Sequence, residues 1–312
     1  MAKTKVFIDG SSGTTGLRIY DRLSARDDIE LITLTEENRK DLRARCEALI
    51  SSDAAFLCLP DAASKEIIST VGNVSTKILD TSTAHRTNPA WAYGFPELSD
   101  TFREKLLASN RIAVPGCHAS GFCSIIAPLV SNGIIPCDYP IVATSVTGYS
   151  GGGKQMIAEY EADERDCLLD SPRQYGLSQH HKHLPEMKAI CGLDFEPCFS
   201  PIVSDFYSGM TVSVPLTSRL LLKKVTAENI HEILSAHYSG QKLISVRPFG
   251  QEGFLGTNEL AGKDSMEIIV TGNDNRILIA STFDNLGKGA SGAAIQCFNL
   301  ITGKDETKGL VL

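Results

Sequence analysis

The strongest candidate for chemistry is Cys117, which stands where a strand pattern ends, a Pro-Gly turn follows and a helical pattern begins. The first turn of a helix offers unpaired backbone N–H groups and the positive end of the helix dipole, and both stabilise a thiolate. The pKa of such a cysteine can fall to about 3.5–7.5, which makes the sulfur nucleophilic at neutral pH. The same N–H groups can hold an oxyanion. We therefore expect a nucleophile at Cys117, and the alternative is a small residue that fills a helix N-terminus.

The other cysteines have less favourable surroundings. Cys58 falls in an expected buried strand, Cys123 in a helix and Cys297 in the apolar stripe of another helix, which are positions typical of core residues. The nine cysteines form no C-x-x-C pair, so we expect free thiols rather than a disulfide framework.

Three of the seven histidines lie within four residues, at His180, His181 and His183. A nucleophilic cysteine needs a proton shuttle that works near pH 7, and histidine is the usual choice. Glu186 follows His183 by three residues and can orient it or bind a substrate amine. Which of the three histidines moves the proton depends on side-chain direction, so that choice stays open.

Two other interpretations of this cluster remain. One is a zinc site completed by Cys191 or Cys198, which the lack of C-x-x-C and H-E-x-x-H patterns disfavours. The other is a surface run of histidines without a role. Our expectation is that no metal is bound.

Two further stretches have the character of anion sites. Residues 144–154 leave a strand through a glycine-rich loop that contains Ser150 and ends at Lys154, which indicates an anion site or a flexible turn. Residues 80–86 follow another strand and end at Arg86, which suits a carboxylate or a phosphate, or else a surface salt bridge.

A glycine loop occupies the first strand-to-helix turn, with glycines at Gly10, Gly13 and Gly16. Glycine lets the backbone turn tightly and approach a pyrophosphate, which the helix N-terminus then binds. The alternative is that the glycines only shape the turn. The expected cofactor-binding residues of the loop are Gly10, Ser11, Ser12, Gly13, Thr14, Thr15 and Gly16.

The residues after the second strand leave the choice of dinucleotide open. Glu36 lies twenty residues after Gly16, where an acidic side chain would bind a ribose 2′-hydroxyl and favour NAD. Arg39 and Lys40 follow closely and could instead hold the 2′-phosphate of NADP. A solvated charged loop is the third interpretation.

The elements that must position these residues fall into two groups. Buried strand patterns at 5–9, 30–34, 53–59, 77–80 and 111–114 alternate with helical patterns, which predicts a doubly wound parallel sheet of the Rossmann type. Helices are expected at 117–132 and 227–238, the latter capped by Thr226. Strand runs at 141–146, 209–214, 243–246, 266–271 and 277–282 predict an α+β region, with the last two strands joined by a longer loop. A final helix spans Ala290 to Ile301.

Composition limits the class of protein. The chain has 312 residues, 42% of them hydrophobic, which predicts two folded domains rather than disorder. The formal net charge of −7 disfavours a nucleic-acid partner. No run of eighteen apolar residues and no signal-peptide pattern occurs, so we expect no membrane association and a cytoplasmic location.

Seven motifs, taken in order along the chain, resemble the shorter type 2 form of the N-acetyl-γ-glutamyl-phosphate reductases. Their superfamily includes aspartate-semialdehyde dehydrogenase. The motifs span nearly the whole sequence and lie at 10–16, 80–86, 93–97, 114–117, 150–154, 181–186 and 285–290. The resemblance implies an NADP-dependent enzyme of arginine biosynthesis that acts on an acyl phosphate, with Cys117 as nucleophile, His183 as acid/base and Glu186 as its partner.

The resemblance also implies further assignments. Asn285 and Gly287 would lie against the nicotinamide, Arg39 would support NADP, and the expected substrate residues are Arg86, Ser150, Lys154 and His181. Residues 1–116 and 286–312 would form the NADP-binding Rossmann domain. Residues 117–285 would form an α+β catalytic and dimerisation domain of a homodimer or homotetramer.

Other functions stay open at this point. A sister acyl-phosphate reductase such as aspartate-semialdehyde dehydrogenase would use identical chemistry and differ only in pocket shape. A cysteine acyl hydrolase or transferase would need Cys117 and His183 but no nicotinamide, and the glycine loop argues against it. A nucleotide-binding sensor would need no nucleophile, and the position of Cys117 argues against that class.

Overall fold

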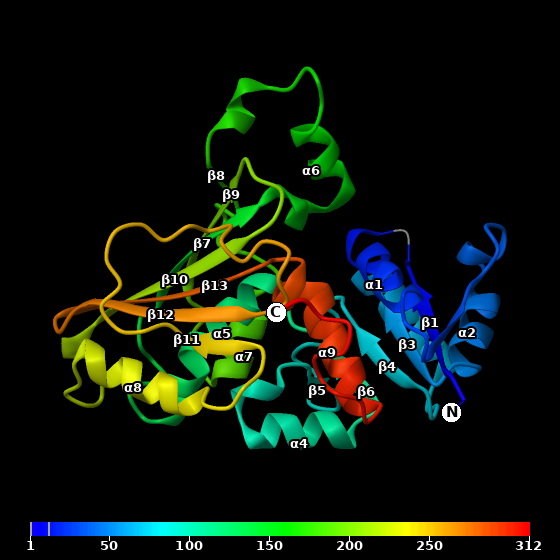
Figure 1. The fold of residues 1–312 in the computed structure, drawn as a ribbon, viewed down its shortest axis with the longest axis horizontal. Coiled ribbons are helices and arrows are strands. Elements are labelled where there is room, and N and C mark those ends of the chain that lie inside the picture. Colours follow the sequence, from blue (N-terminus) through cyan, green and yellow to red (C-terminus); the bar gives the residue numbers. More distant parts are fainter. Residues whose placement is uncertain (1, 12) are drawn as a thin grey trace. The chain divides into compact units, whose positions relative to one another are not determined.

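The computed structural model describes residues 2–11 and 13–312 and divides into two compact units (Figure 1). The first, called the N-terminal unit, comprises Met1–Pro115 and Ala290–Leu310. The second, called the central unit, comprises Gly116–Gly289 and Val311–Leu312. Ser12, one of the expected cofactor-binding residues, lies outside the described residues.

The N-terminal unit is built on a six-stranded sheet in the order β2-β1-β3-β4-β6-β5, and every pair of neighbouring strands is parallel. The prediction of a Rossmann-type parallel sheet is therefore confirmed. The strands are β1 (Thr4–Asp9), β2 (Ile29–Ile32), β3 (Ala54–Leu57), β4 (Lys77–Asp80), β5 (Ala92–Tyr93) and β6 (Arg111–Ala113). The helices are α1 (Thr14–Ser24), α2 (Leu42–Ile50), α3 (Asp61–Val71), α4 (Asp100–Ala108) and α9 (Gly292–Ile301).

Helices cover both faces of this sheet because successive strand residues point to opposite sides. Val6 and Ile8 of β1 belong to a core with residues of α1 and α9. Phe7, between them, belongs to a second core with residues of α2 and α3. Both faces are therefore buried, and this is why the strands read as short continuous apolar runs.

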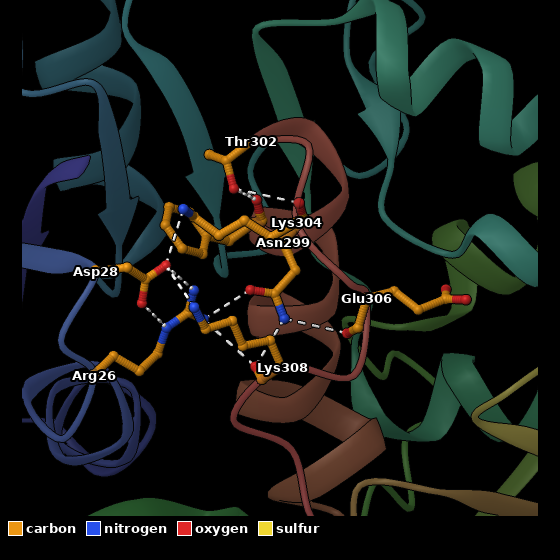
Figure 2. A network of polar contacts seen from close by, with 8 residues as sticks. Arg26, Asp28, Asn299, Thr302, Lys304, Glu306 and Lys308 are labelled. Atoms are coloured by element: carbon orange, nitrogen blue, oxygen red, sulfur yellow. Dashed lines mark hydrogen bonds and ion pairs between the residues drawn. The ribbon is translucent and has the colours of Figure 1, made fainter. Parts of the chain in front are cut away.

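A polar network attaches the segment after α9 to the start of β2 (Figure 2). Asp28 forms ion pairs with Arg26 at 2.9 Å, Lys304 at 2.9 Å and Lys308 at 3.1 Å. Arg26 also donates to the side-chain oxygen of Asn299 at 2.7 Å. Within the N-terminal unit, these contacts hold α9 and the segment up to Lys308 against the start of β2.

The central unit contains a seven-stranded mixed sheet in the order β11-β12-β13-β10-β7-β9-β8, which confirms the prediction of an α+β region. The strands are β7 (Val142–Gly148), β8 (Arg173–Gln174), β9 (Cys198–Ser204), β10 (Met210–Thr217), β11 (Ile244–Val246), β12 (Met266–Asn273) and β13 (Arg276–Phe283). The helices are α5 (Cys117–Ser131), α6 (Gly153–Tyr160), α7 (Leu184–Cys191) and α8 (Ala227–His237). Helix α5 packs on β10 and β13, and α8 packs on β11 and β12 (Figure 1).

Several local predictions need correction. The loop between β12 and β13 is short, because the strands pair as far as Asn273 and Arg276 and the Asn273 side chain accepts the N–H groups of Asn275 and Arg276. Helix α9 begins at Gly292 because a π-helical turn occupies Gly287–Ser291. Cys58 lies just past the end of β3 rather than inside it.

Candidate active site

Cys117 is the first residue of α5, as the sequence predicts, and Gly116 precedes it in an extended conformation. The side chain of Cys117 is half-buried. The first turn of α5 contains no acidic residue, so no carboxylate within that turn opposes the positive end of the helix dipole at the sulfur. The start of a helix is a common position for nucleophilic cysteines.

Glu186 lies beside the start of α5, although it belongs to α7. Its carboxylate is 2% exposed and accepts a hydrogen bond from the backbone N–H of Gly116 at 2.8 Å. His183 precedes α7 at the N-cap position, so the three-residue spacing places His183 and Glu186 on one helical turn. Glu186 thereby fixes the backbone directly before Cys117.

Two of the three clustered histidines come together in the structure. The rings of His181 and His183 lie 4.8 Å apart, His183 is buried, and His180 is exposed. Burial lowers the pKa of His181 to about 4, so this side chain is neutral near pH 7.

His118 completes the cluster and was not singled out from the sequence. Its ring lies 5.2 Å from that of His181 and 5.5 Å from that of His183. Burial lowers the pKa of His118 to about 3. The sequence signal that could have identified His118 is its position directly after Cys117. A histidine in a largely apolar helix, however, resembles a core residue.

Ser150 and Asn285 are brought together by the structure. The Asn285 amide nitrogen donates to Ser150 Oγ at 3.0 Å, and its oxygen accepts from the backbone N–H of Gly209 at 2.9 Å. Both side chains are buried, whereas Lys154, at the start of α6, is exposed. The backbone of Gly287 lies so close to the carbonyl of Lys263 that a Cβ would overlap it.

Arg86 is 8% exposed and lies in the N-terminal unit. Its guanidinium donates to the carbonyl oxygens of Val114 and Thr81, each at 2.9 Å. The side chain is therefore buried rather than at the surface, where the alternative interpretation placed it. Arg86 holds together the ends of two neighbouring segments that follow β4 and β6.

The glycine loop forms a tight turn between β1 and α1. Gly10 has a φ of +82°, and a Cβ there would overlap the carbonyl oxygen of Cys58. A Cβ on Gly16 would overlap the carbonyl oxygen of Gly10. Gly13 caps α1, which begins at Thr14, so the turn presents the N–H groups of a helix N-terminus.

A crevice of about 740 Å³ opens beside this loop, within the N-terminal unit. Its lining includes Gly10, Ser11, Glu36, Arg39 and Lys40. Arg39 forms an ion pair with Glu36 at 2.7 Å. The side chain expected to favour NADP therefore contacts the one expected to favour NAD. The backbone donors and the cations fit a pyrophosphate and a further phosphate.

Deeper in the crevice, Asp9 and Arg45 form a buried ion pair at 2.9 Å. Burial raises the pKa of Asp9, although the Arg45 guanidinium opposes that shift. The pair fixes the last residue of β1, directly before Gly10.

The described residues offer neither a metal site nor a membrane-spanning helix. Across residues 2–11 and 13–312, no group of three or more His, Cys, Asp or Glu side chains is arranged to hold a metal ion. No helix in the same residues is long and apolar enough to span a bilayer.

Comparison with known proteins first defines the class. Residues 5–106 match the family model described as "Semialdehyde dehydrogenase, NAD binding domain", and residues 117–285 match "Semialdehyde dehydrogenase, dimerisation domain". The fold is similar to that of aspartate semialdehyde dehydrogenase II from Vibrio cholerae, with a TM-score of 0.71 and 16% identity over 97% of this chain and 99% of that one. The enzyme from Francisella tularensis gives a TM-score of 0.71 and 15% identity over 96% and 100%. Fold and site define an oxidoreductase of the semialdehyde dehydrogenase class.

Curated relatives then narrow the family. N-acetyl-gamma-glutamyl-phosphate reductase 2 from Nostoc is 43% identical over 322 residues, which cover 99% of this chain and 100% of that protein. The reductase from Brucella ovis is 45% identical over 309 residues, covering 97% and 100%. The chain belongs to the N-acetyl-γ-glutamyl-phosphate reductases.

Proposed function

We propose that this protein reduces N-acetyl-γ-glutamyl phosphate to N-acetylglutamate 5-semialdehyde with NADPH and releases inorganic phosphate, a step of arginine biosynthesis. The observation that carries the proposal is the arrangement around Cys117. The sulfur lies at the start of α5, in the same unit as His181, His183 and Glu186. Relatives with the same activity in their names align over nearly the whole chain.

The chemistry begins at the Cys117 sulfur. The thiolate attacks the acyl carbon, a C–S bond forms, and the C–O bond to phosphate breaks with its electron pair on the departing phosphate. Backbone N–H groups in the first turn of α5 are suited to stabilise the negative charge on the acyl oxygen. The product of this half-reaction is a thioester on Cys117.

The second half-reaction is a reduction. NADPH, when bound, supplies a hydride to the thioester carbon. His183 gives a proton to the resulting oxygen and takes it back as the C–S bond breaks and the sulfur leaves as thiolate. The aldehyde is released, and Cys117 and His183 return to their starting states.

The two candidate cations for the substrate, Lys154 and Arg86, differ in how exposed their side chains are. Lys154 is exposed at the start of α6, whereas Arg86 is buried on two backbone carbonyls. We therefore favour Lys154 for the phosphate or carboxylate of the substrate, and we retain Ser150 and His181 as further substrate residues. Arg86 has the additional task of holding the segment before Cys117.

The cofactor residues follow from the crevice in the N-terminal unit. The N–H groups at the start of α1 suit the pyrophosphate. Arg39 and Lys40 suit the 2′-phosphate that distinguishes NADP from NAD. Asn285 supports the segment up to Gly287 through its bonds to Ser150 and Gly209, and this segment is the candidate for contact with the nicotinamide.

Assembly and location complete the proposal. Residues 117–285 match a dimerisation domain, so we expect a homodimer or a homotetramer. An enzyme of amino-acid biosynthesis that uses NADPH is expected to work in the cytoplasm.

Replacement of the nucleophile tests the proposal. Cys117→Ala should abolish NADPH oxidation with the acyl phosphate while NADPH fluorescence still reports binding. Cys137→Ala is the matched control, because Cys137 is an exposed cysteine of the same unit. Unchanged turnover in Cys117→Ala would end the proposal, and substrate hydrolysis without NADPH oxidation in the wild type would favour a hydrolase.

A further inference from the structure

His118 is a buried histidine with both ring nitrogens engaged. It directly follows Cys117 in α5 and is 3% exposed. Its Nδ1 lies 2.7 Å from Ser145 Oγ in β7, and its Nε2 lies 2.7 Å from the hydroxyl oxygen of Tyr175. The hydrogen-bonded series Ser145–His118–Tyr175 is called the relay. It runs from a buried strand residue to the phenol of Tyr175.

The protonation state of His118 follows from its surroundings. Burial is the main cause that lowers its pKa to about 3, and the positive charge of Lys182, together with that of His181 when it is protonated, lowers it further. The ring is therefore neutral near pH 7, with one nitrogen donating and the other accepting. Two tautomers are possible, and they direct the hydrogen bonds of the relay in opposite senses.

Ser145 decides between these tautomers. Its side chain is fully buried, and across the described residues its only side-chain hydrogen bond is the one to His118 Nδ1. If Nδ1 carried the hydrogen, the buried hydroxyl hydrogen of Ser145 would have no acceptor, which is costly in a protein interior. The satisfied arrangement has the Ser145 hydroxyl donating to Nδ1 and Nε2–H donating to the Tyr175 oxygen.

This direction leaves the Tyr175 hydroxyl hydrogen available for another acceptor. Burial and the negative charge of the Cys117 thiolate both raise the pKa of Tyr175, so the phenol stays protonated. The position of the hydroxyl is given by its contact of 2.7 Å with the ring of His118, the residue that directly follows Cys117. Within the described residues, His118 is the one hydrogen-bond partner of this hydroxyl.

We propose that Tyr175 is a further catalytic residue that donates a hydrogen bond to the acyl oxygen of the substrate at Cys117, and that Ser145 and His118 are positioning residues that aim it. The inference rests on the proposed function, because it takes Cys117 as the nucleophile. A neutral donor held in place before the reaction stabilises charge that develops only in the transition state.

The tautomer is measurable without any substrate. Long-range ¹H–¹⁵N correlation spectra of the ¹⁵N-histidine-labelled wild-type protein distinguish the two neutral forms. His118→Asn and His181→Asn spectra assign the signals. We expect His118 as the Nε2–H tautomer, unchanged between about pH 5 and pH 8 as its lowered pKa requires. An Nδ1–H tautomer, or titration of His118 in this range, would overturn the relay.

Kinetics test the role of the phenol. Tyr175→Phe should lower kcat at least about tenfold and leave the KM for NADPH unchanged. Ser145→Ala should cause a smaller loss, because His118 can then adopt the other tautomer and accept from Tyr175. The control is Tyr139→Phe, which removes a buried hydroxyl that accepts from the backbone N–H of Thr217.

The outcomes separate this inference from the proposed function. Full activity of Tyr175→Phe would overturn the catalytic role of Tyr175 while the proposed reaction stands. A wild-type protein that does not turn over the acyl phosphate would end the proposed function, and the catalytic role of Tyr175 with it. The spectra would then still decide whether the relay has the inferred direction.

Discussion

The buried carboxylate of Glu186 accepts a hydrogen bond of 2.8 Å from the backbone N–H of Gly116, the residue directly before Cys117. This contact joins α7 to the start of α5. It satisfies an N–H that has no partner within the helix, and it holds the backbone from which the nucleophile projects. A residue that sequence spacing suggests as a partner of His183 therefore also has a defined structural task.

Substitutions of Glu186 separate these two tasks. Glu186→Gln retains an acceptor oxygen, so the free energy of unfolding should stay within about 1 kcal/mol of the wild type. Glu186→Ala leaves the Gly116 N–H buried without its acceptor and should cost about 1–3 kcal/mol, with a loss of kcat. Urea unfolding and steady-state kinetics measure both effects. Equal stability of the two variants would contradict the assigned contact.

The glycine loop allows a prediction at single positions. Gly16→Ala should destabilise the fold, because its Cβ would overlap the Gly10 carbonyl. Gly13→Ala should leave thermal stability unchanged, since its Cβ would meet the Gly10 oxygen at an ordinary 3.5 Å. The added methyl group should nevertheless weaken NADPH binding at least about tenfold, because it stands where the backbone must approach a pyrophosphate.

Thermal unfolding and a fluorescence titration with NADPH test this pair of variants together. Gly13→Ala is the informative one, because it isolates cofactor binding from folding. Wild-type affinity for NADPH in Gly13→Ala would mean that the cofactor does not bind at this loop.

The ion pair between Glu36 and Arg39 predicts how cofactor preference can be changed. Glu36→Gln removes a negative charge and frees Arg39, so the KM for NADPH should fall several-fold. Arg39→Ala should raise that KM about tenfold and leave the KM for NADH nearly unchanged. Initial rates with both cofactors at two salt concentrations check this, since exposed charges are screened by salt. Identical effects on the two cofactors would contradict a 2′-phosphate site at Arg39.

Asp28 gives a prediction about acid stability. Ion pairs with Arg26, Lys304 and Lys308 hold its pKa well below the usual range. Its stabilising contribution is therefore fully present above the unfolded-state pKa of about 3.9, and it is lost as pH falls toward the folded-state value. Asp28→Asn should cost about 2 kcal/mol near pH 7 and less near pH 3.

The matched control is Glu47→Gln, which breaks an exposed ion pair with Arg43 on α2. Such pairs contribute little, so the change should stay within about 0.5 kcal/mol. Urea unfolding at several pH values measures both variants. An Asp28→Asn effect that does not change with pH would contradict the role assigned to the charge.

Local signals made part of the site predictable. The Pro-Gly turn and the apolar periodicity after it identify Cys117 at a helix start, and the spacing of His183 and Glu186 indicates one helical turn. The contact from Glu186 to Gly116 spans 70 residues, and no local pattern reports it. His118 was missed for the same reason, since Ser145 and Tyr175 lie 27 and 57 residues away from it.

In the fold, too, local patterns were predictable from the sequence and long-range contacts were not. The parallel strands of the N-terminal unit are predictable because each is a short apolar run followed by a helical pattern. Strand β9 gave no such signal, because Pro201 interrupts it and its parallel pairing with β7 is a long-range contact. The short turn at Asp274–Asn275 depends on side-chain acceptors that composition alone does not specify.

The central claim is that Cys117 and NADP carry out reduction of an acetylated acyl phosphate, and the reverse reaction tests it most directly. N-acetylglutamate 5-semialdehyde, phosphate and NADP⁺ are mixed with the protein, with aspartate semialdehyde in a parallel assay, and NADPH absorbance is followed. Phosphate-dependent NADPH formation with the acetylated substrate alone is the predicted result. Formation with aspartate semialdehyde instead, or none with either substrate from a folded protein that binds NADPH, would contradict it.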